Sequence, residues 1–355
     1  MAVLFLHDFH QARGAIFSTQ NGFETVASYG STEKEYLALT ASCGLVDLSF
    51  RSRVCLLGPD REKFLHGQVT NEILRLLPGE GTYAALVTAK GKLQCDLFVY
   101  KLAEELLLDF EPGLTAGITQ RLEKYIIAED VQIVDVAPHY GLLSLQGPGS
   151  AKALQSTHVL PSLPEKQLAW TKAALPGGDL YVVSNPRFGS SGFDLFVPIA
   201  DLLQIATRLA EFAESVGFDA CEIARVENAI PRFGVDMDES NLAPEALGEG
   251  AISYAKGCYI GQEVIARIRT YGQVAKALRL VRLPSEQQAV PARGEKLFKD
   301  GREVGYITSS ILSPKHGGMV ALGYLRKEAN APGEKLQFGS PDGGTAQVVA
   351  VPGNG

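Results

Sequence analysis

Short apolar runs separated by turn residues make up most of the chain, and their lengths are typical of strands. Between them lie stretches in which apolar residues recur with helical spacing. The runs predict strands at residues 83–88, 93–100, 105–109, 180–183 and 193–197, with residues 89–92 as a hairpin turn. The helical stretches lie at residues 120–125, 201–215 and 221–229. Strands and helices in this order predict an α+β fold.

Two segments have the same pattern: an apolar strand, then Gly-Pro, then a helical stretch. They are residues 54–65 and 143–154, and their Gly-Pro pairs begin at Gly58 and Gly147, 89 residues apart. Proline suits the first helical turn, because the N–H that it lacks would have no partner within the helix. We interpret the segments as two related β–α–β units of ferredoxin-like type. In the alternative interpretation, Gly-Pro separates strands from helices without any repeat.

The pattern changes after Gly272, where short apolar runs are separated by proline and glycine. The runs lie at residues 278–281, 296–298, 304–307 and 319–323. Several short strands at this spacing predict a small antiparallel β-barrel. We therefore expect two interleaved α+β subdomains in residues 1–272 and a C-terminal barrel domain in residues 273–355.

Composition restricts the class of protein. The 355 residues are 46% hydrophobic and 21% charged, with a net charge of -7, which is typical of a globular protein without a broad nucleic-acid surface. The N-terminal apolar run is too short for a signal peptide or a membrane span, so we expect a cytoplasmic protein. The five cysteines include no Cys-x-x-Cys, so we expect reduced thiols and no metal bound by the chain itself.

The most informative motif is Lys-Gly-Cys-Tyr-Ile-Gly-Gln-Glu at residues 256–263. Cysteine reacts as the thiolate, and a nearby cation or the start of a helix lowers the pKa of a thiol. Lys256 stands two residues before Cys258, and residues 262–268 are typical of the start of a short helix or of a strand. Cys258 is thus a candidate working thiol with Lys256 as its activator, supported by Gly257, Tyr259, Gly261, Gln262 and Glu263. In the alternative interpretation, Cys258 is a small buried hydrophobic residue beside a glycine turn.

This motif resembles the signature of the YgfZ family, folate-binding proteins related to the T-protein (aminomethyltransferase) of the glycine cleavage system. Weaker likenesses follow in the same order along most of the chain: Leu-Val-Asp-Leu-Ser at 45–49, Leu-Gln-Gly-Pro at 145–148, and Gly-Val-Asp-Met-Asp-Glu at 234–239. The resemblance implies three domains in a ring around a central opening that holds tetrahydrofolate. That count agrees with two α+β units and a barrel.

The resemblance also implies folate contacts. Tyr83 matches the tyrosine that packs on the folate, and Asp194 matches the acid that grips the pterin ring. A carboxylate can accept two N–H bonds from the guanidine-like edge of a pterin, although aspartate is one methylene shorter than the family's glutamate. Arg225 matches a family arginine, with an ion pair to Glu222 or Glu227 as the alternative. Asp96 is a further candidate on the segment after the hairpin.

One departure from the T-protein pattern bears on activity. T-proteins have Asp-Asp-Leu where this chain has Cys95-Asp96-Leu97, and the first Asp is the one thought to govern one-carbon transfer. A thiol of ordinary pKa is mostly neutral at pH 7 and does not replace a carboxylate's charge. Asp96 points to the opposite face if the segment is a strand. We therefore expect no T-protein type of transfer, and leave open whether the protein is an enzyme.

The leading hypothesis is a monomeric, tetrahydrofolate-binding accessory protein for the assembly or repair of iron–sulfur enzymes, including those that modify tRNA. Its partners would be folate and iron–sulfur client or assembly proteins, without direct nucleic-acid binding. The alternative is a folate-dependent aminomethyl- or methyltransferase that uses Asp96. A third possibility is a scaffold whose folate cavity is vestigial. We expect Cys258 at the surface, because Lys256 and Glu263 need solvent or a partner.

Overall fold

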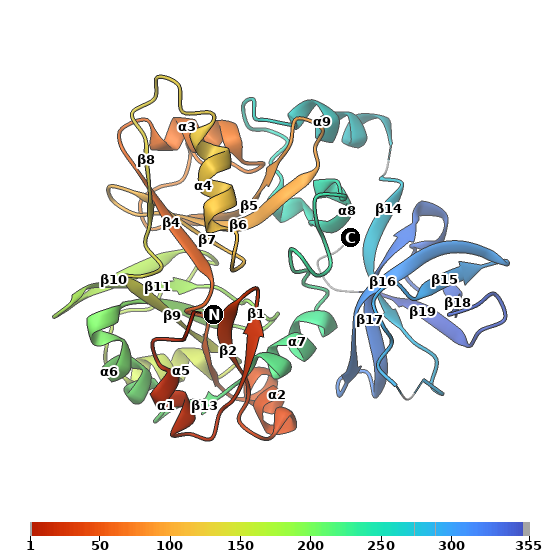
Figure 1. Ribbon diagram of the computed structural model, residues 1–355, viewed down its shortest axis with the longest axis horizontal. Helices are drawn as coiled ribbons and strands as arrows, with labels where there is room; N and C mark the ends of the chain where they lie inside the picture. Colours follow the sequence, from red (N-terminus) through yellow and green to blue (C-terminus); the bar gives the residue numbers. More distant parts are fainter. Residues whose placement is uncertain (1, 273, 288, 351–355) are drawn as a thin grey trace. The chain divides into compact units, whose positions relative to one another are not determined.

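The computed structural model describes residues 2–272, 274–287 and 289–350 (Figure 1). These residues form two compact units. The first unit contains the residues up to Gln68, Glu72–Ala84 and Leu97–Ala224, and the second contains Val69–Asn71, Ala85–Asp96 and the residues from Arg225 on. The predicted domain boundary falls on Gln273, which lies outside the described residues.

Two β-sheets organise the N-terminal part of the chain. One has the strand order β5-β6-β7-β4-β8, with bounds Gly81–Val87, Leu93–Lys101, Leu106–Phe110, Ser52–Leu57 and Gln132–Asp135. The other has the order β10-β11-β12-β9-β3-β13, with bounds Trp170–Leu175, Gly178–Ser184, Gly192–Pro198, Tyr140–Gln146, Gly44–Asp47 and Glu214–Ser215. The predicted strands and the predicted hairpin between β5 and β6 are therefore confirmed.

The internal repeat is confirmed by the order of the elements. The first copy runs β4-α3-β5-β6-β7-α4-β8 and the second runs β9-α5-β10-β11-β12-α6-β13. The four helices are Arg61–Gln68 (α3), Thr115–Glu123 (α4), Ser150–Ser156 (α5) and Ile199–Leu209 (α6). Both sheets follow the same strand order, except that β3 stands between β9 and β13 in the second.

The glycines of the two Gly-Pro pairs have the same structural role. Gly58 and Gly147 both have positive φ, +97° and +117°. A Cβ atom would lie 2.1 Å from the Asp130 carbonyl oxygen at Gly58, and 2.6 Å from the Ser42 carbonyl oxygen at Gly147. Only glycine allows this approach. Asp130 precedes β8 and Ser42 precedes β3. In the sheet, β3 therefore pairs with β9 where β8 pairs with β4, although β13 matches β8 in the order along the chain.

A helix predicted at residues 201–215 is shorter in the structure. Helix α6 ends at Leu209, and Glu214–Ser215 form β13, which pairs in parallel with Gly44 and Leu45 of β3. Pairing with a strand distant in sequence thus overrides the local helical pattern. The apolar face of α6, with Leu202, Ile205 and Leu209, packs on the sheet residues Leu143, Leu145 and Leu195.

The remaining elements of this part lie before β3 and after β13. They are α1 (His7–Gln11), β1 (Ile16–Gln20), β2 (Phe23–Ser28), α2 (Thr32–Ala41) and α7 (Phe218–Glu227). Strands β1 and β2 form an antiparallel pair. No helix among the described residues combines the length and the apolar character needed to cross a membrane.

The second unit contains the predicted barrel, drawn in blue in Figure 1. It is closed, in the order β14-β17-β16-β15-β18-β19, with bounds Lys276–Arg282, Gly318–Arg326, Arg302–Ser313, Lys296–Lys299, Lys335–Phe338 and Thr345–Val349. Alternate residues such as Val281, Ala321 and Leu336 fill its core. Before it come the short helices α8 (Ala243–Ala246) and η1 (Glu249–Ala251), then α9 (Gln262–Tyr271), and η2 (Lys327–Ala329) follows β17. The α+β class with a C-terminal barrel is confirmed.

Candidate functional site

In the first unit, two predicted folate residues belong to one connected cluster. The rings of Tyr83 and Phe98 have their centroids 5.0 Å apart. The guanidinium carbon of Arg187 lies 5.0 Å from the Phe98 centroid, which is within cation–π range. Arg187 Nε donates to Asp194 Oδ2 at 2.7 Å. Tyr83 and Asp194 are thus joined through Phe98 and Arg187, neither of which the sequence singled out.

Asp194 is fully buried, and its carboxylate is occupied by the chain itself. Oδ1 accepts from Ser144 Oγ at 2.7 Å, while Oδ2 accepts from Asn185 Nδ2 at 2.8 Å as well as from Arg187. Three of its roughly four acceptor positions are therefore filled. This arrangement does not fit a carboxylate that grips a pterin edge with both oxygens. One N–H of a guanidinium, one amide N–H and one hydroxyl already occupy the carboxylate.

Arg187 retains hydrogen-bonding capacity as a donor. Its Nε binds Asp194 and its Nη2 binds Asp109, but its Nη1 makes no hydrogen bond to a described residue. A flat heteroaromatic ligand can stack on Tyr83 and accept a hydrogen bond from such a nitrogen. The residues present fit a pterin in this way, with Arg187 as the polar contact and Asp194 as its support.

The support of Arg187 continues into a buried ionic array. Asp109, on β7, is fully buried and accepts from Arg187 Nη2 and from Arg51 Nε, the latter at 2.8 Å. Arg51 Nη1 also donates to Glu111 Oε1 at 2.6 Å. Burial alone would raise the pKa of Asp109, but the two guanidinium groups outweigh it and hold the pKa below its ordinary value. The array keeps Arg187 in one orientation.

The structure places Cys95 and Asp96 on opposite faces of β6. Along this strand Leu93, Cys95 and Leu97 are buried, whereas Gln94 and Asp96 are partly exposed. Cys95 has no exposed surface, and its thiol donates to the Asp96 carbonyl oxygen at 3.1 Å. A side chain at position 95 therefore lies within the core. Having Cys95 where T-proteins have an acid therefore removes no charge from the accessible face of the strand. The absence of that acid is then no longer a reason to expect that the protein lacks transfer activity.

Arg225 in the second unit is buried, with only 2% of its surface exposed. Its Nη1 donates to Asp236 Oδ2 at 2.6 Å and its Nη2 to Ser309 Oγ at 2.8 Å. Asp236 also accepts from Thr308 and Ser309 at 2.6 and 2.7 Å. Arg225 therefore belongs to a buried ion pair, as in the alternative interpretation, and Asp236 is a partner that was not expected. The folate role of Arg225 stays a prediction.

Lys256 of the motif is buried, so of the solvent or the partner that it was expected to need, it has a partner. Its Nζ donates to the carbonyl oxygens of Val69 and Asn71 at 2.7 and 2.8 Å and lies 4.9 Å from the ring centroid of Tyr259. Ser253 N also donates to the Thr70 carbonyl oxygen at 3.0 Å. Lys256 therefore ties residues 69–71 to the motif, a structural role that was not foreseen. Its action as an activator of Cys258 stays a prediction.

Gly261 allows the motif to pack against the hairpin tip at residues 85–96. It has φ +83°, and a Cβ atom there would lie 2.4 Å from the Thr88 carbonyl oxygen. Helix α9 begins directly after it at Gln262, so the helical interpretation of residues 262–268 is confirmed. Glu263 is exposed and pairs with Arg267 at 2.9 Å, which is an ordinary helix surface pair.

Cys258 is exposed, as expected, while the other four cysteines are buried. Its neighbours Lys256 and Tyr259 are both anchored in the second unit. Packing thus explains Lys256, Tyr259 and Gly261, but it does not explain a cysteine at position 258. Within the described ranges no three His, Cys, Asp or Glu side chains are grouped to hold a metal ion.

Arg187 and Asp109 are the candidate residues that the sequence interpretation missed. A signal was present for Asp109, because a charged residue inside the apolar run at 106–110 must find a buried partner. Arg187 stands in a loop between β11 and β12, where no periodicity indicates which way a side chain points.

Two protein-family models together match most of the chain. The family model described as the GCVT N-terminal domain matches residues 6–256. A second, described as the glycine cleavage T-protein C-terminal barrel domain, matches residues 276–353. The aminomethyltransferase of Desulforamulus reducens is 27% identical over 329 residues, 90% of this chain and 88% of the relative. That of Halothermothrix orenii is 24% identical and covers 98% of each chain.

The fold has a close match among solved structures. The glycine cleavage system aminomethyltransferase T from Bartonella henselae superposes with a TM-score of 0.89 over 99% of this chain and 97% of that one, at 23% identity. The likeness extends over both α+β repeats and the barrel. With both domain models matched in order, the chain belongs to the glycine cleavage T-protein family of aminomethyltransferases.

Proposed function

We propose that this protein is a tetrahydrofolate-dependent aminomethyltransferase with Asp96 as its acid. The observation that carries the proposal is the orientation of β6: Cys95 is buried in the core, whereas Asp96 lies on the partly exposed face. Asp96 shares that face with Phe98, two residues and roughly 7 Å further along the strand. The similarity to named aminomethyltransferases over nearly the whole chain supports the same reaction class.

Each residue has a role in this proposal. Tyr83 stacks on the pterin and Arg187 Nη1 donates a hydrogen bond to it, with Asp194 and Asp109 holding the guanidinium in place. In the transfer, the carbon of the aminomethyl group would form bonds to two nitrogens of tetrahydrofolate while its bonds to the lipoyl sulfur and to the amino nitrogen break, which releases the dihydrolipoyl thiol and ammonia. Asp96 gives or takes a proton at one of these nitrogens, as a general acid or base. The proposal assigns Asp194 a positioning role, since its own oxygens are occupied.

The test is a transfer assay with purified protein, a lipoyl-bound aminomethyl donor and tetrahydrofolate, read as methylene-tetrahydrofolate formed. Asp96→Asn is expected to lower kcat by about 10²- to 10⁴-fold, the usual effect of losing a positioned acid or base. Cys95→Ala is the matched control, and we expect its kcat to stay within about threefold of the parent value because Cys95 is buried on the other face. No product from the parent protein, or equal loss in both variants, would contradict the proposal.

A second candidate function rests on Cys258. We propose that this thiol supports the assembly or repair of iron–sulfur enzymes, including those that thiomethylate tRNA, with the protein acting as a monomer on its client. The observation that favours it is the exposed cysteine between anchored neighbours, in a motif that resembles the YgfZ signature. An exposed thiol can exchange with a disulfide, attack an electrophile or bind iron transiently.

Cys258→Ser in cells that lack the native protein is expected to lower the activity of iron–sulfur enzymes as much as deletion of the gene does. Glu263→Gln is the control, because Glu263 is an exposed neighbour in the same motif and its surface pair contributes little. Asp96→Asn in the same cells should leave the activity of iron–sulfur enzymes unchanged, because the second candidate function does not need this acid. Full iron–sulfur activity in the Cys258→Ser strain would eliminate this candidate.

A further inference from the structure

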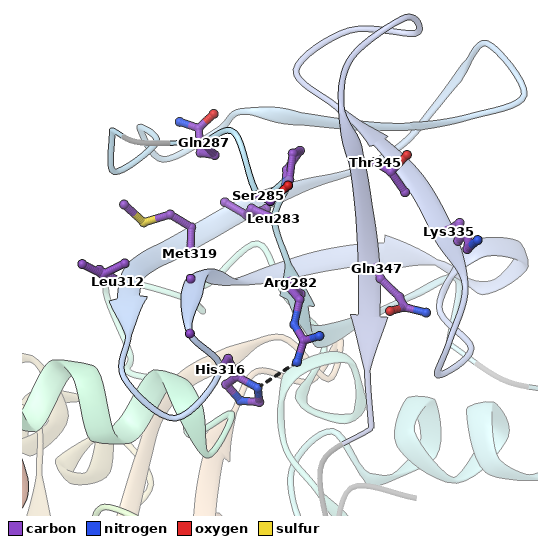
Figure 2. Close-up of a pocket in the computed structure, with 13 residues that line it drawn as sticks. Arg282, Leu283, Ser285, Gln287, Leu312, His316, Met319, Lys335, Thr345 and Gln347 are labelled. Atoms are coloured by element: carbon purple, nitrogen blue, oxygen red, sulfur yellow. Dashed lines mark hydrogen bonds between the residues drawn. The ribbon is translucent and has the colours of Figure 1, made fainter.

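One end of the barrel holds a cavity of about 560 Å³. It lies where β14 ends at Arg282 and where β17 and β19 begin, at Gly318 and Thr345. Figure 2 shows Leu312 and Met319 on one side of it, Gln347 and Lys335 on the other, and Arg282 between them. A volume of this size is typical of pockets that take small molecules.

The polar side of the cavity is set by strand register. Arg282 of β14 stands opposite Gln347 of β19, and Gln347 stands opposite Lys335 of β18. Residues directly opposite on adjacent strands point to the same side of a sheet. The two cations are therefore separated by two strand spacings, roughly 10 Å, with an amide between them. Both side chains are long enough to reach one anionic group above Gln347.

The charge of the cavity is of one sign. None of its 13 lining residues is an aspartate or glutamate. Neither Arg282 nor Lys335 pairs with any carboxylate of the described residues, whereas Lys296 and Lys299 of the same barrel pair with Glu303 and Glu334 at 2.8 and 3.0 Å. Cations without a protein partner at a concave site are available to an anion from solution.

His316 orients Arg282 without adding a second fixed charge. Arg282 Nη2 lies 3.5 Å from His316 Nδ1, which accepts the hydrogen bond. Burial, together with the neighbouring cations Lys315 and Arg282, lowers the pKa of His316. The imidazole is therefore neutral at pH 7 and accepts from the guanidinium instead of repelling it.

The apolar side is formed by Leu312 and Met319, which stand opposite each other on β16 and β17. Leu312 is 60% exposed, although its residue type is usually covered. A ligand that covers it would remove apolar surface from water. Arg282 stands opposite Val320, the residue after Met319. The register therefore directs the cations to the outer side of the barrel wall and Leu312 and Met319 to its inner side. The two groups meet at the ends of these strands, where both line the cavity.

We propose that this end of the barrel binds a small organic anion, a phosphate monoester with an apolar substituent. Arg282 and Lys335 hold the phosphate, because a guanidinium fork and an ammonium both match phosphate oxygens. The amide nitrogen of Gln347 donates one hydrogen to the Gly333 carbonyl oxygen at 3.2 Å and is left with a second for the phosphate. The apolar substituent extends around the strand ends and packs on Leu312. This site is separate from the residues of the transfer reaction and does not depend on the proposed function.

Phenyl phosphate is the probe, measured by isothermal titration calorimetry with the full-length protein at low salt. We expect saturable one-to-one binding that is weakened at least tenfold in the Arg282→Gln/Lys335→Gln double variant. Lys296→Gln/Lys299→Gln removes the same charge from the same barrel and should change the affinity less than twofold. Leu312→Ser should weaken phenyl phosphate several-fold but leave inorganic phosphate unchanged.

Three results would overturn the proposal. Absence of saturable binding at millimolar phenyl phosphate excludes the site. Equal weakening in the two double variants means that net charge alone attracts the probe. The third result is that the protein sediments with vesicles of phosphatidylcholine and phosphatidic acid and that the Arg282→Gln/Lys335→Gln variant does not. If phenyl phosphate also fails to compete with the vesicles, the two cations bind a lipid surface and not a small molecule.

Discussion

Replacing Arg187 with methionine is expected to lower the free energy of unfolding of the first unit by about 3–5 kcal/mol. Arg187 is the only residue of the described array that bonds both Asp109 and Asp194, and both carboxylates are fully buried. Methionine fills a similar volume but leaves two buried carboxylates without this cation. Urea unfolding followed by circular dichroism at pH 7 measures the difference.

Lys172→Met is the matched control for Arg187→Met. Lys172 pairs with Asp179 at 2.7 Å, but its side chain is 53% exposed, so solvent screens the pair. We expect a change below about 1 kcal/mol. A similar decrease in the free energy of unfolding in both variants would show that the buried ion pairs of Arg187 stabilise the protein no more than an exposed pair does.

Lowering the pH should reduce the loss of stability caused by Arg187→Met. The pKa of folded Asp109 is lowered, so its contribution to stability is complete above the unfolded pKa of about 4 and is lost as the pH falls through the folded value. The difference between parent and variant should therefore be largest near pH 7 and shrink below about pH 4. A difference that is independent of pH would mean that packing of the Arg187 side chain, and not its charge, stabilises the unit.

Gly261→Ala is expected to destabilise the second unit by about 3 kcal/mol, by adding a steric overlap to an unfavourable backbone conformation. The new Cβ would lie 2.4 Å from the Thr88 carbonyl oxygen, and a backbone atom cannot move aside as a side chain can. Gly234→Ala is a close control, because Gly234 has φ +84° but nothing within 4 Å of the added atom.

The two glycine variants distinguish the cost of the left-handed backbone conformation from the cost of the steric overlap. Gly234→Ala should cost only the left-handed conformation, about 1–2 kcal/mol. Gly261→Ala should in addition speed amide hydrogen exchange in residues 85–96, which pack on the motif, and Gly234→Ala should not. Equal unfolding energies and equal exchange in the two variants would mean that the motif does not hold the hairpin tip.

Much of the fold could be predicted from local pattern. The apolar runs at 83–88 and 93–100 flank a turn, and the Gly-Pro pairs at 58 and 147 indicate a repeat that the element order confirms. β13 could not be predicted, because two residues, Glu214 and Ser215, carry no strand period and are strand only through pairing with β3.

The candidate site was partly predictable, and one error had a signal against it. Leu93, Cys95 and Leu97 alternate with polar residues, so a period of two already assigns Cys95 to the buried face. The same period places Asp96 on the other face of the strand, where it is partly exposed. By contrast, Arg187 lies in a loop, where the sequence has no periodicity. The sequence therefore does not indicate whether its side chain binds Asp194, binds Asp109 or points to solvent.

The insertion of β3 has a consequence for synthesis on the ribosome. Gly44 pairs with Gln146 and Asp47 with Leu143, so roughly 100 residues must follow β3 before its partner emerges. The first repeat, from β4 to β8, is made entirely within that interval and can fold while β3 waits. Until β9 appears, the apolar residues Leu45 and Val46 form an unpaired edge that a nascent-chain chaperone would need to cover.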